Sequence, residues 1–163
     1  MVCPKDRVLL WPGMITYRRI STTDSEYILE KDLRFRVLRQ PLGLVLSEED
    51  ICDEENQVHV VAVDDRGNVV GCVVVAFHDK KARIRQLAVE APLRGQGIGK
   101  ELIRHAEEAA QEREVREIML HARVTSQGFF DRLGYTAASG VFEEVTIPHI
   151  EMKKSLITVN HSA

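Results

Sequence analysis

The sequence predicts an α/β (α+β) protein with a mixed, mostly antiparallel sheet of about six to seven strands and helices on both faces. Three observations lead to this fold class. Short runs rich in β-branched residues recur along the chain between segments of helical periodicity. A hairpin signal at residues 64–68, Asp-Asp-Arg-Gly-Asn, joins two of the apolar runs. A glycine-rich loop at residues 94–99 separates an apolar run from a long amphipathic segment.

The first elements follow from local patterns. Apolar and polar residues alternate at 14–20, which predicts an opening strand. Polar caps at 22–24 precede a helix whose apolar spacing runs over 27–38, and Pro41 and Gly43 end it.

The middle of the chain predicts an antiparallel meander. The acidic stretch 47–57 is expected to form an exposed connection or a short helix. Strands at 58–63 and 69–77 flank the hairpin turn, and a third strand at 82–89 follows a polar turn.

The last third predicts helices that pack on the sheet and strands that close it. Apolar residues recur on one face of a helix at 100–114, and charged residues cover the opposite face. A strand at 118–122 and a short helix at 126–133 follow, with Gly134 as the C-terminal stop. Residues 141–152 supply two more strands.

Composition indicates one domain, residues 1–163, with 44% hydrophobic residues and a net charge of −3. Charges of both signs are interspersed without a basic run, which argues against nucleic acid and anionic membranes as partners. No segment is apolar for long enough to span a bilayer, and no signal-peptide core is expected. Cys3, Cys52 and Cys72 lack the spacing of a disulfide framework or zinc site, which favours a reducing cytoplasm, and Cys72 is expected to be buried.

The loop at 94–99, Arg-Gly-Gln-Gly-Ile-Gly, has the features of an anion cradle. Glycines let backbone N–H groups approach a ligand closely, and the following helix adds unpaired donors and partial positive charge. A dinucleotide fingerprint is excluded because Lys100 stands at its third glycine, and a Walker-type loop because Arg94 and Glu101 replace its Gly and Ser or Thr. A tight strand-to-helix turn would explain one glycine but not three beside an arginine. The pattern fits a pyrophosphate held by amides and a forked cation.

Several ordered motifs resemble the GNAT acetyltransferase family. Residues 86–102, QLAVEAPLRGQGIGKEL, are similar to its Gln/Arg-x-x-Gly-x-Gly/Ala signature in strand, loop and helix order. Residues 129–135, FFDRLGY, resemble its Phe-Tyr-x-x-Leu-Gly-Phe/Tyr segment. Residues 38–43 and 141–152 are similar to the ElaA-like subgroup, so the resemblance covers roughly residues 15–155.

The resemblance implies the GNAT fold, acetyl-CoA as cofactor, no metal, and transfer of an acetyl group to a primary amine by direct attack in a ternary complex. In the family, the strand before the loop parts from its neighbour, and its free backbone groups pair with the pantetheine arm. The residues thereby expected to bind the cofactor are Leu87, Ala88, Val89, Arg94, Gly95, Gln96, Gly97, Ile98, Gly99, Lys100, Thr125, Phe129 and Phe130.

The chemistry needs a neutral amine, and a lysine-like amine with a pKa of about 10.4 is mostly protonated at pH 7, so a general base or ordered water is expected. The family draws its oxyanion donor from a backbone N–H, here that of Val89. Candidate bases are His149 and Glu144, which would line the acceptor pocket, and His121, beside the expected cofactor gap. His59 is a weaker candidate. Each histidine has a structural alternative, a hydrogen-bonded residue of a strand.

Three positions depart from the family pattern. Phe130 replaces the tyrosine that protonates the leaving thiolate in many members, Thr125 replaces a common asparagine, and Arg85 replaces a common glutamate. Tyr135 is expected to pack in the core and not to act as an acid. Because a thiol with a pKa near about 8.5 can take its proton from water, the loss of the tyrosine need not abolish turnover.

The predicted function is an acetyl-CoA-dependent N-acetyltransferase with a small-molecule or peptide amine as acceptor. The main alternative is a non-catalytic acyl-CoA-binding regulatory module, to which Phe130 and Arg85 point. A third possibility is a nucleotide-hydrolysing protein, which only the glycine-rich loop supports. The oligomeric state stays open, with a homodimer among the alternatives.

Overall fold

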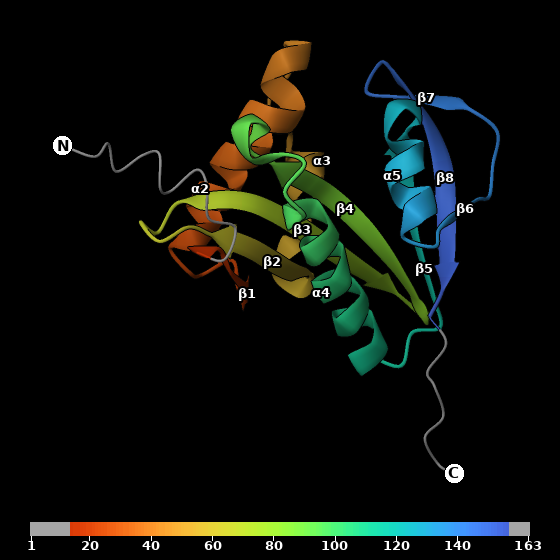
Figure 1. The fold of residues 1–163 in the computed structure, drawn as a ribbon, viewed down its shortest axis with the longest axis horizontal. Coiled ribbons are helices and arrows are strands. Elements are labelled where there is room, and N and C mark those ends of the chain that lie inside the picture. The colour runs from red at the N-terminus through yellow and green to blue at the C-terminus, as the bar shows by residue number, and fades with distance from the viewer. Residues whose placement is uncertain (1–13, 157–163) are drawn as a thin grey trace. The chain divides into compact units, whose positions relative to one another are not determined.

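The computed structural model of the chain describes residues 14–156, and Figure 1 shows their eight-stranded sheet and helices. The strand order is β1-β2-β3-β4-β5-β8-β6, and β7 pairs with β8 outside this path. The strands are β1 Thr16–Ile20, β2 Val58–Val63, β3 Val69–His78, β4 Lys81–Val89, β5 Glu117–Arg123, β6 Thr136–Ala137, β7 Phe142–Glu144 and β8 Ile147–Ser155.

The helices lie between these strands in the chain. The α-helices are α2 Glu26–Arg34, α3 Glu48–Ile51, α4 Ile98–Glu112 and α5 Gln127–Arg132. The short 3₁₀ helices are η3 Gln40–Leu42, η4 Glu54–Asn56, η5 Ala91–Leu93 and η6 Val124–Ser126, and α2 continues into a π-helix, η2 Phe35–Arg39. No helix within residues 14–156 is both long and apolar enough to cross a membrane.

The described chain divides into two compact units. Unit 1 contains the residues up to Val74 together with Gln86–Ala106, and unit 2 contains Val75–Arg85 together with the residues from Glu107 onward.

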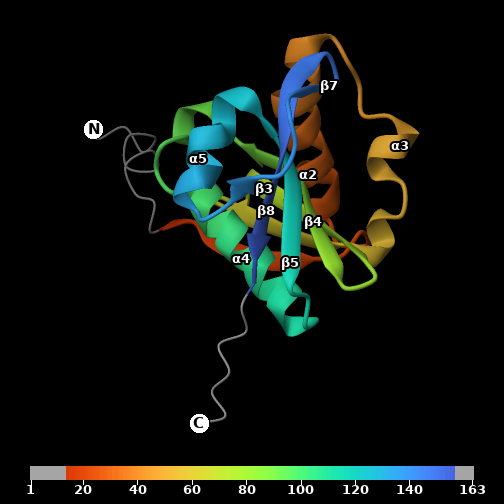
Figure 2. The same ribbon diagram turned by 90° about the vertical axis from the view of Figure 1, so that its right-hand side faces the viewer.

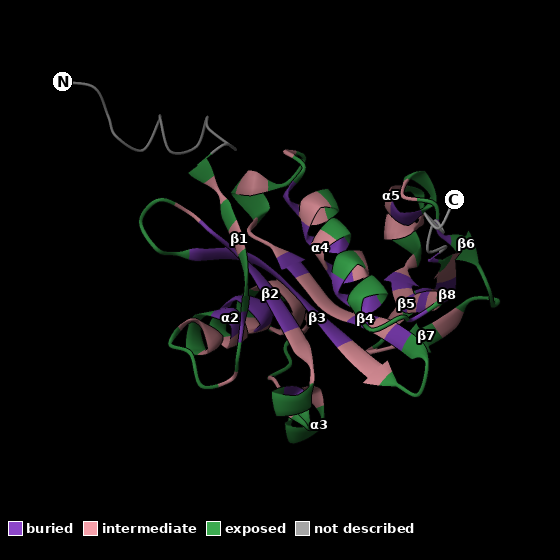
Figure 3. Ribbon diagram, turned by 90° about the horizontal axis from the view of Figure 1, so that it is seen from below, coloured by how far each residue is buried: buried purple, intermediate pink, exposed green. Residues whose placement is uncertain are grey.

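Unit 1 carries helices on both faces of its strands. Leu33 of α2 packs in one buried cluster with Val61, Val63 and Cys72. Ala62 points to the opposite face because side chains alternate along a strand. On that face α4 approaches Gly71 so closely that an added Cβ would lie 3.1 Å from Ile98 and 3.1 Å from Leu102. Figure 3 shows β2 and most of β3 as buried, as expected for strands covered on both sides.

In unit 2, β5 lies between a parallel and an antiparallel neighbour. Residues Lys81–Ile84 of β4 pair in parallel with Glu117–Leu120 of β5. On its other side, the whole of β5 pairs antiparallel with β8. Alternate residues of β5 are buried, whereas the residues between them are half-buried. Figure 2 shows α5 on one side of β5 and β8, and β7 beside one end of β8. The second face of this sheet carries the polar residues described below.

The predicted fold class and element order are confirmed, with two differences in detail. The sheet has one strand more than expected because β6 contains only Thr136–Ala137, too short for a periodicity signal. The long helix begins at Ile98, two residues before the predicted start. Cys72 is buried and Cys52 exposed, both as free thiols. The prediction for Cys3 and the N-terminal residues lies outside the described part of the chain.

Candidate active site

The glycine-rich loop of unit 1 joins β4 to α4 through the 3₁₀ turn η5. Gly95 and Gly97 have φ angles of 80° and 87°, in the left-handed region that glycine adopts without strain. Apart from the adjoining residues of the chain, no atom of the described residues lies within 4 Å of a Cβ built at either glycine. Both glycines therefore face open space, and α4 starts directly after Gly97.

Residues 96–100, which run from the end of the loop into the first turn of α4, differ in how exposed they are. Gln96 and Gly99 are half-buried, and Lys100 is exposed. The Ile98 side chain is buried against Gly71, so only its backbone is available to a ligand. The prediction that Ile98 contacts the cofactor therefore concerns its backbone and stays a prediction.

The segment before the glycines is fixed by contacts within unit 1. The backbone N–H of Glu90 donates to the Val70 carbonyl at 2.9 Å, and the Arg94 Nε donates to the Val89 carbonyl at 3.1 Å. Arg36 of η2 donates to both carboxylate oxygens of Glu90, at 2.9 and 3.2 Å. The entry to the loop is thereby tied to β3 and to the π-helix.

The strand that leads to the loop is irregular at Gln86. Its φ of 53° is unusual for a residue other than glycine, and the Cys72 thiol donates to its carbonyl oxygen at 3.4 Å. Of the following residues, Ala88 is buried, and Leu87 and Val89 are half-buried. Such a local deformation re-aims the backbone of the strand end, where the predicted cofactor contacts lie.

Unit 2 brings the three predicted catalytic side chains together. Nδ1 of His121 lies 2.9 Å from Oε1 of Glu144, and Nε2 of His149 lies 3.9 Å from Oε2 of the same carboxylate. Arg83 and Glu151 complete the group: Arg83 Nη2 lies 3.0 Å from His121 Nδ1, and Glu151 Oε1 lies 3.8 Å from His121 Nε2. We call these five residues the polar cluster. They come from β4, β5, β7 and β8 and share one face of the sheet.

The tautomer of His149 follows from its hydrogen bond. Nδ1 lies 2.7 Å from the Ile147 carbonyl oxygen, which can only accept, so Nδ1 carries a proton. In the neutral ring the lone pair is therefore on Nε2, which faces Glu144. The Phe142 ring stacks on His149 with 6.2 Å between ring centroids and meets the His121 ring edge-on at 5.0 Å. His149 is buried and Glu144 is partly exposed, so the carboxylate is the more accessible group.

A strained turn holds Glu144. It directly precedes the two-residue link Val145-Thr146, which joins β7 to β8 with φ angles of 45° and 64°. Two-residue hairpins with positive φ at both positions favour Asn and Gly, and β-branched residues are unfavourable there. The strain lies next to the polar cluster, as is common at functional sites.

The aromatic residues predicted near the cofactor occupy α5 and its surroundings. Phe130 is buried and packs edge-on against Phe129 and Tyr135, with ring centroids 4.9 and 5.8 Å away. Tyr135 is buried and donates its hydroxyl to Glu107 at 2.8 Å; burial and then the Glu107 charge raise its pKa. Its expected packing role is thereby confirmed. Thr125 is exposed in η6, directly after β5.

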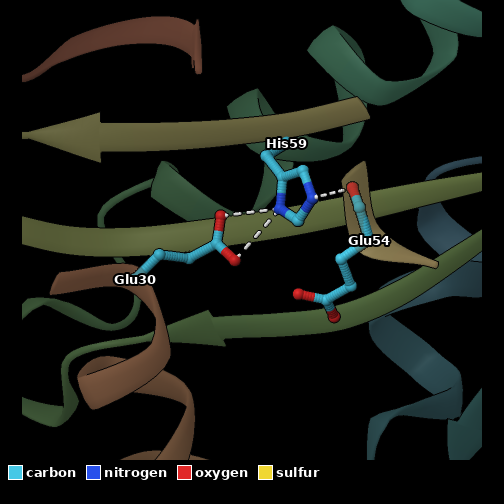
Figure 4. A group of neighbouring side chains, drawn as sticks. All are labelled: Glu30, Glu54 and His59. Carbon is cyan, nitrogen blue, oxygen red and sulfur yellow. Dashed lines mark hydrogen bonds and ion pairs between the residues drawn. The ribbon is translucent and has the colours of Figure 1, made fainter. Parts of the chain in front are cut away.

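A second charged group lies in the interior of unit 1, and Figure 4 shows three of its side chains. Glu30, Arg34, Glu54 and His59 are all buried. Arg34 donates to Glu30 at 2.8 Å and to Glu54 at 2.9 and 2.6 Å. His59 Nδ1 lies 3.0 and 3.1 Å from the Glu30 carboxylate oxygens, and Nε2 lies 2.9 Å from the Glu54 carbonyl. We call these four residues the buried network.

The buried network contains the donor set of a metal site, because ligand atoms of Glu30, Glu54 and His59 lie within 4.8 Å of one another. Arg34, however, already binds both carboxylates as a cation. Both ring nitrogens of His59 face acceptors, so the ring carries two protons and a second positive charge. Burial opposes that charge, but the hydrogen bond and charge of Glu30 outweigh it and raise the pKa of His59. Two cations thus balance two carboxylates without a metal.

The structure also identifies site residues that the sequence patterns did not. Arg83 and Glu151 belong to the polar cluster. Arg83 lies in no motif, and Glu151 lies in the segment 141–152 but is not among the predicted site residues. Glu30 and Arg34 are spaced i, i+4 within the apolar stripe of α2, a signal that could have indicated a buried ion pair. His59, the one member of the buried network considered as a base, has both ring nitrogens engaged.

Comparison with known proteins gives a family match and many similar folds. A family model described as "Acetyltransferase (GNAT) domain" matches residues 45–156. An uncharacterised N-acetyltransferase from Chlorobaculum tepidum is 41% identical over 73 residues, which cover 44% of this chain and 46% of that relative.

Two solved structures support the same fold. The crystal structure of a putative N-acetyltransferase from Lactobacillus plantarum has a TM-score of 0.79 at 23% identity and covers 88% of this chain and 99% of its own. The Escherichia coli ElaA structure has a TM-score of 0.73 at 21% identity, with coverage of 86% and 99%.

Proposed function

Because the chain belongs to the GNAT acetyltransferase family, we propose that its glycine-rich loop holds the diphosphate of acetyl-CoA and that the polar cluster prepares the acceptor amine. The function best supported by the family match is that of an acetyl-CoA-dependent N-acetyltransferase. The observation that carries the residue assignment is the His149 ring, whose hydrogen bond to Ile147 leaves the lone pair on Nε2, next to Glu144.

The loop has the chemistry that a diphosphate requires. Backbone N–H groups around Gly95 and Gly97, the start of α4, and the charges of Arg94 and Lys100 all favour an anion. The open space at the two glycines lets a phosphate approach the main chain. Acetyl-CoA supplies an acetyl thioester, which an amine can attack. Leu87, Ala88, Thr125, Phe129 and Phe130 stay as predicted contacts of its pantetheine arm, and Val89 as the predicted backbone donor.

The polar cluster holds groups that would bind the protonated acceptor amine and remove its proton. Removing a proton from a lysine-like amine at pH 7 costs about 4.6 kcal/mol, so a base must be positioned near it. Glu144 and Glu151 would attract the ammonium form, and Nε2 of His149 would accept its proton. His149 can then pass that proton toward Glu144 and solvent. Glu144 thus binds and orients, while His149 acts as general base.

The cellular location, the acceptor class, the domain organisation and the oligomeric state are also proposals. We infer a cytoplasmic enzyme, since Cys52 and Cys72 are free thiols without disulfide spacing. The acceptor would be a small molecule or peptide carrying a primary amine. We treat residues 1–163 as one catalytic domain, because β3, β4 and α4 each contribute residues to both units. A homodimer would be compatible with this assignment.

The non-catalytic acyl-CoA-binding module stays the second candidate because Phe130 has no proton to donate. Its buried position among Phe129 and Tyr135 gives this side chain a packing role instead. The two functions differ in one measurement, the release of free coenzyme A thiol in the presence of amines.

Three variants and two measurements test both halves of the proposal. Gly97→Asp should weaken coenzyme A binding at least about tenfold relative to Gly97→Asn, because both residues tolerate positive φ and only Asp adds an anion. His149→Asn should retain coenzyme A binding and lose about 100-fold in kcat. Asn keeps an N–H near the Nδ1 position for Ile147 but has no group at Nε2.

Calorimetry measures the first effect and thiol release measures the second. Equal affinities of the Gly97→Asp and Gly97→Asn variants would contradict the phosphate site. An unchanged kcat of His149→Asn would show that His149 is not the general base. A folded wild-type protein that binds coenzyme A but releases no thiol with a broad panel of amines would favour the non-catalytic module.

A further inference from the structure

His121 has one ring nitrogen with two competing partners. Nδ1 lies 3.0 Å from Nη2 of Arg83 and 2.9 Å from Oε1 of Glu144. A guanidinium only donates hydrogen bonds, and a carboxylate only accepts them. A ring nitrogen either carries a proton or presents a lone pair. Nδ1 can therefore serve Arg83 or Glu144, but not both at once.

The two states have different consequences for Glu144. If Nδ1 carries a proton, His121 donates to Oε1 and engages the carboxylate. If Nδ1 presents its lone pair, it accepts from Arg83, and Oε1 is released from His121 for another donor. In the neutral ring the second state places the proton on Nε2, which faces the Glu151 carboxylate at 3.8 Å.

We propose that Arg83 is a positioning residue that holds His121 in its Nε2–H tautomer and so keeps Glu144 available to the acceptor ammonium. The inference rests on the proposed function, because it assumes that Glu144 receives the acceptor. Arg83 itself contacts neither the amine nor His149 in this scheme. It acts on specificity and binding through the imidazole.

The position of Arg83 suits this role. Parallel pairing places Arg83 opposite Met119, and His121 is two residues farther along β5 on the same face. Arg83 Nε is buried and has no hydrogen-bond partner within residues 14–156, so Nη2 carries its polar contact with the ring. The same Nη2 lies 3.8 Å from Glu144 Oε1. The guanidinium thus lies near both the His121 ring and the Glu144 carboxylate.

The groups around His121 come from every neighbouring strand. Arg83 lies on β4, Glu144 and Phe142 on β7, and Glu151 on β8. Of the polar groups among them, only Arg83 is a donor. Removal of this donor leaves carboxylates facing both ring nitrogens, which favours a proton on Nδ1.

Nitrogen-15 spectra of the imidazole rings test the tautomer directly. In the wild-type protein with neutral histidines, the His121 signals should show an unprotonated Nδ1 and a protonated Nε2. Arg83→Met should reverse this assignment or protonate both nitrogens, and Arg83→Lys, which retains a donor, should preserve it. The His121 signals are assigned by their loss in His121→Gln. Lys81→Met is the matched control, because it removes an exposed charge from the same face of β4, two residues away.

Kinetics test the consequence. Arg83→Met should raise KM for the acceptor amine about tenfold and change kcat by less than about twofold, and Arg83→Lys should restore KM. Lys81→Met should leave both constants unchanged. An unaltered His121 tautomer in Arg83→Met would overturn the inference. So would a lower KM, since it would show that Arg83 merely repels the ammonium.

These outcomes are separate from a failure of the proposed function. If His149→Asn retains full kcat, the base assignment fails whatever tautomer His121 adopts. If the tautomer depends on Arg83 and KM does not, Glu144 does not receive the acceptor, and the inference fails while transferase activity stands.

Discussion

The buried network and the polar cluster both place histidine among carboxylates, but they differ in how completely the hydrogen bonds of those histidines are satisfied. In the buried network both ring nitrogens of His59 have acceptors at 3.1 Å or less, and Arg34 pairs with both carboxylates. In the polar cluster one nitrogen of His121 has two rivals, and Nε2 of His149 lies 3.9 Å from its nearest partner atom on Glu144.

This difference distinguishes a structural role for the buried network from the catalytic role proposed for the polar cluster. A buried charge is costly unless it is paired and hydrogen-bonded. The buried network pairs two cations with two carboxylates, and among its side chains only Arg34 Nε is buried without a hydrogen-bond partner within residues 14–156. It joins α2, η4 and β2, and it leaves no group available for a substrate. The polar cluster is partly exposed and incompletely paired, so its groups can change partners or take up a proton. We therefore expect similar residues to stabilise the fold in the buried network and to take part in the proposed reaction in the polar cluster.

The largest expected effect comes from breaking the buried network. Arg34→Met should lower the free energy of unfolding by about 3–5 kcal/mol, because it leaves Glu30 and Glu54 buried beside a single cation. Urea unfolding measures it. Arg36→Met is the matched control two residues along the chain, and it should cost less than about 1 kcal/mol because its ion pairs are partly exposed.

A loss for Arg34→Met no larger than that for Arg36→Met would mean that the buried charges do not hold unit 1 together. Where Arg34→Met fails to fold, the double variant Arg34→Met with Glu54→Gln removes one cation together with one anion. It should recover part of the stability.

The opposite pattern is expected in the polar cluster. Glu144→Gln should reduce kcat/KM for the acceptor about 100-fold, since the neutral amide cannot attract the ammonium or take a proton from His149. Its free energy of unfolding should change by less than about 0.5 kcal/mol, because the side chain is partly exposed. Initial rates and urea unfolding of the same preparation check both. A large loss of stability with intact turnover would make the two regions alike.

The sequence predicted those parts of the site that depend on local chain order. Gly95 and Gly97 precede a helix, and their positive φ angles follow from glycine at those positions. Glu144 and His149 lie in a segment that resembles a family, and His121 is predicted beside the expected cofactor gap. The structure brings these three side chains together. Their catalytic roles stay predictions.

The remaining residues depend on pairing between distant segments. Arg83 enters the polar cluster only through the parallel register of β4 with β5, which no local pattern specifies. Glu30 and Glu54 are brought to one place by α2 and η4, although acidic residues usually predict an exposed surface. The turn at Val145-Thr146 violates the usual turn chemistry, so the strands at 141–152 were predictable and their link was not.

The smallest expected effect is the pH dependence of the free energy of unfolding, which also distinguishes the two regions. The raised pKa of His59 means that its imidazolium contributes stability that is complete below the ordinary value of 6.5 and is lost as pH rises through the folded-state pKa. For Glu54, burial opposes the charge, but the hydrogen bond and charge of Arg34 lower its pKa. Its contribution is complete above the ordinary value of 4.5 and is lost as pH falls below it.

The free energy of unfolding should therefore be greatest between pH 4.5 and pH 6.5. It should decline as the pH rises above 6.5. Urea midpoints are measured up to about pH 8.5, because burial raises the pKa of Cys72 and its ionisation on unfolding would add a further decline above that range. His59→Gln should be less stable and should lose the alkaline decline, since the titrating group is gone. His121→Gln should retain it. If His121→Gln flattens the curve and His59→Gln does not, the stabilising imidazolium lies in the polar cluster.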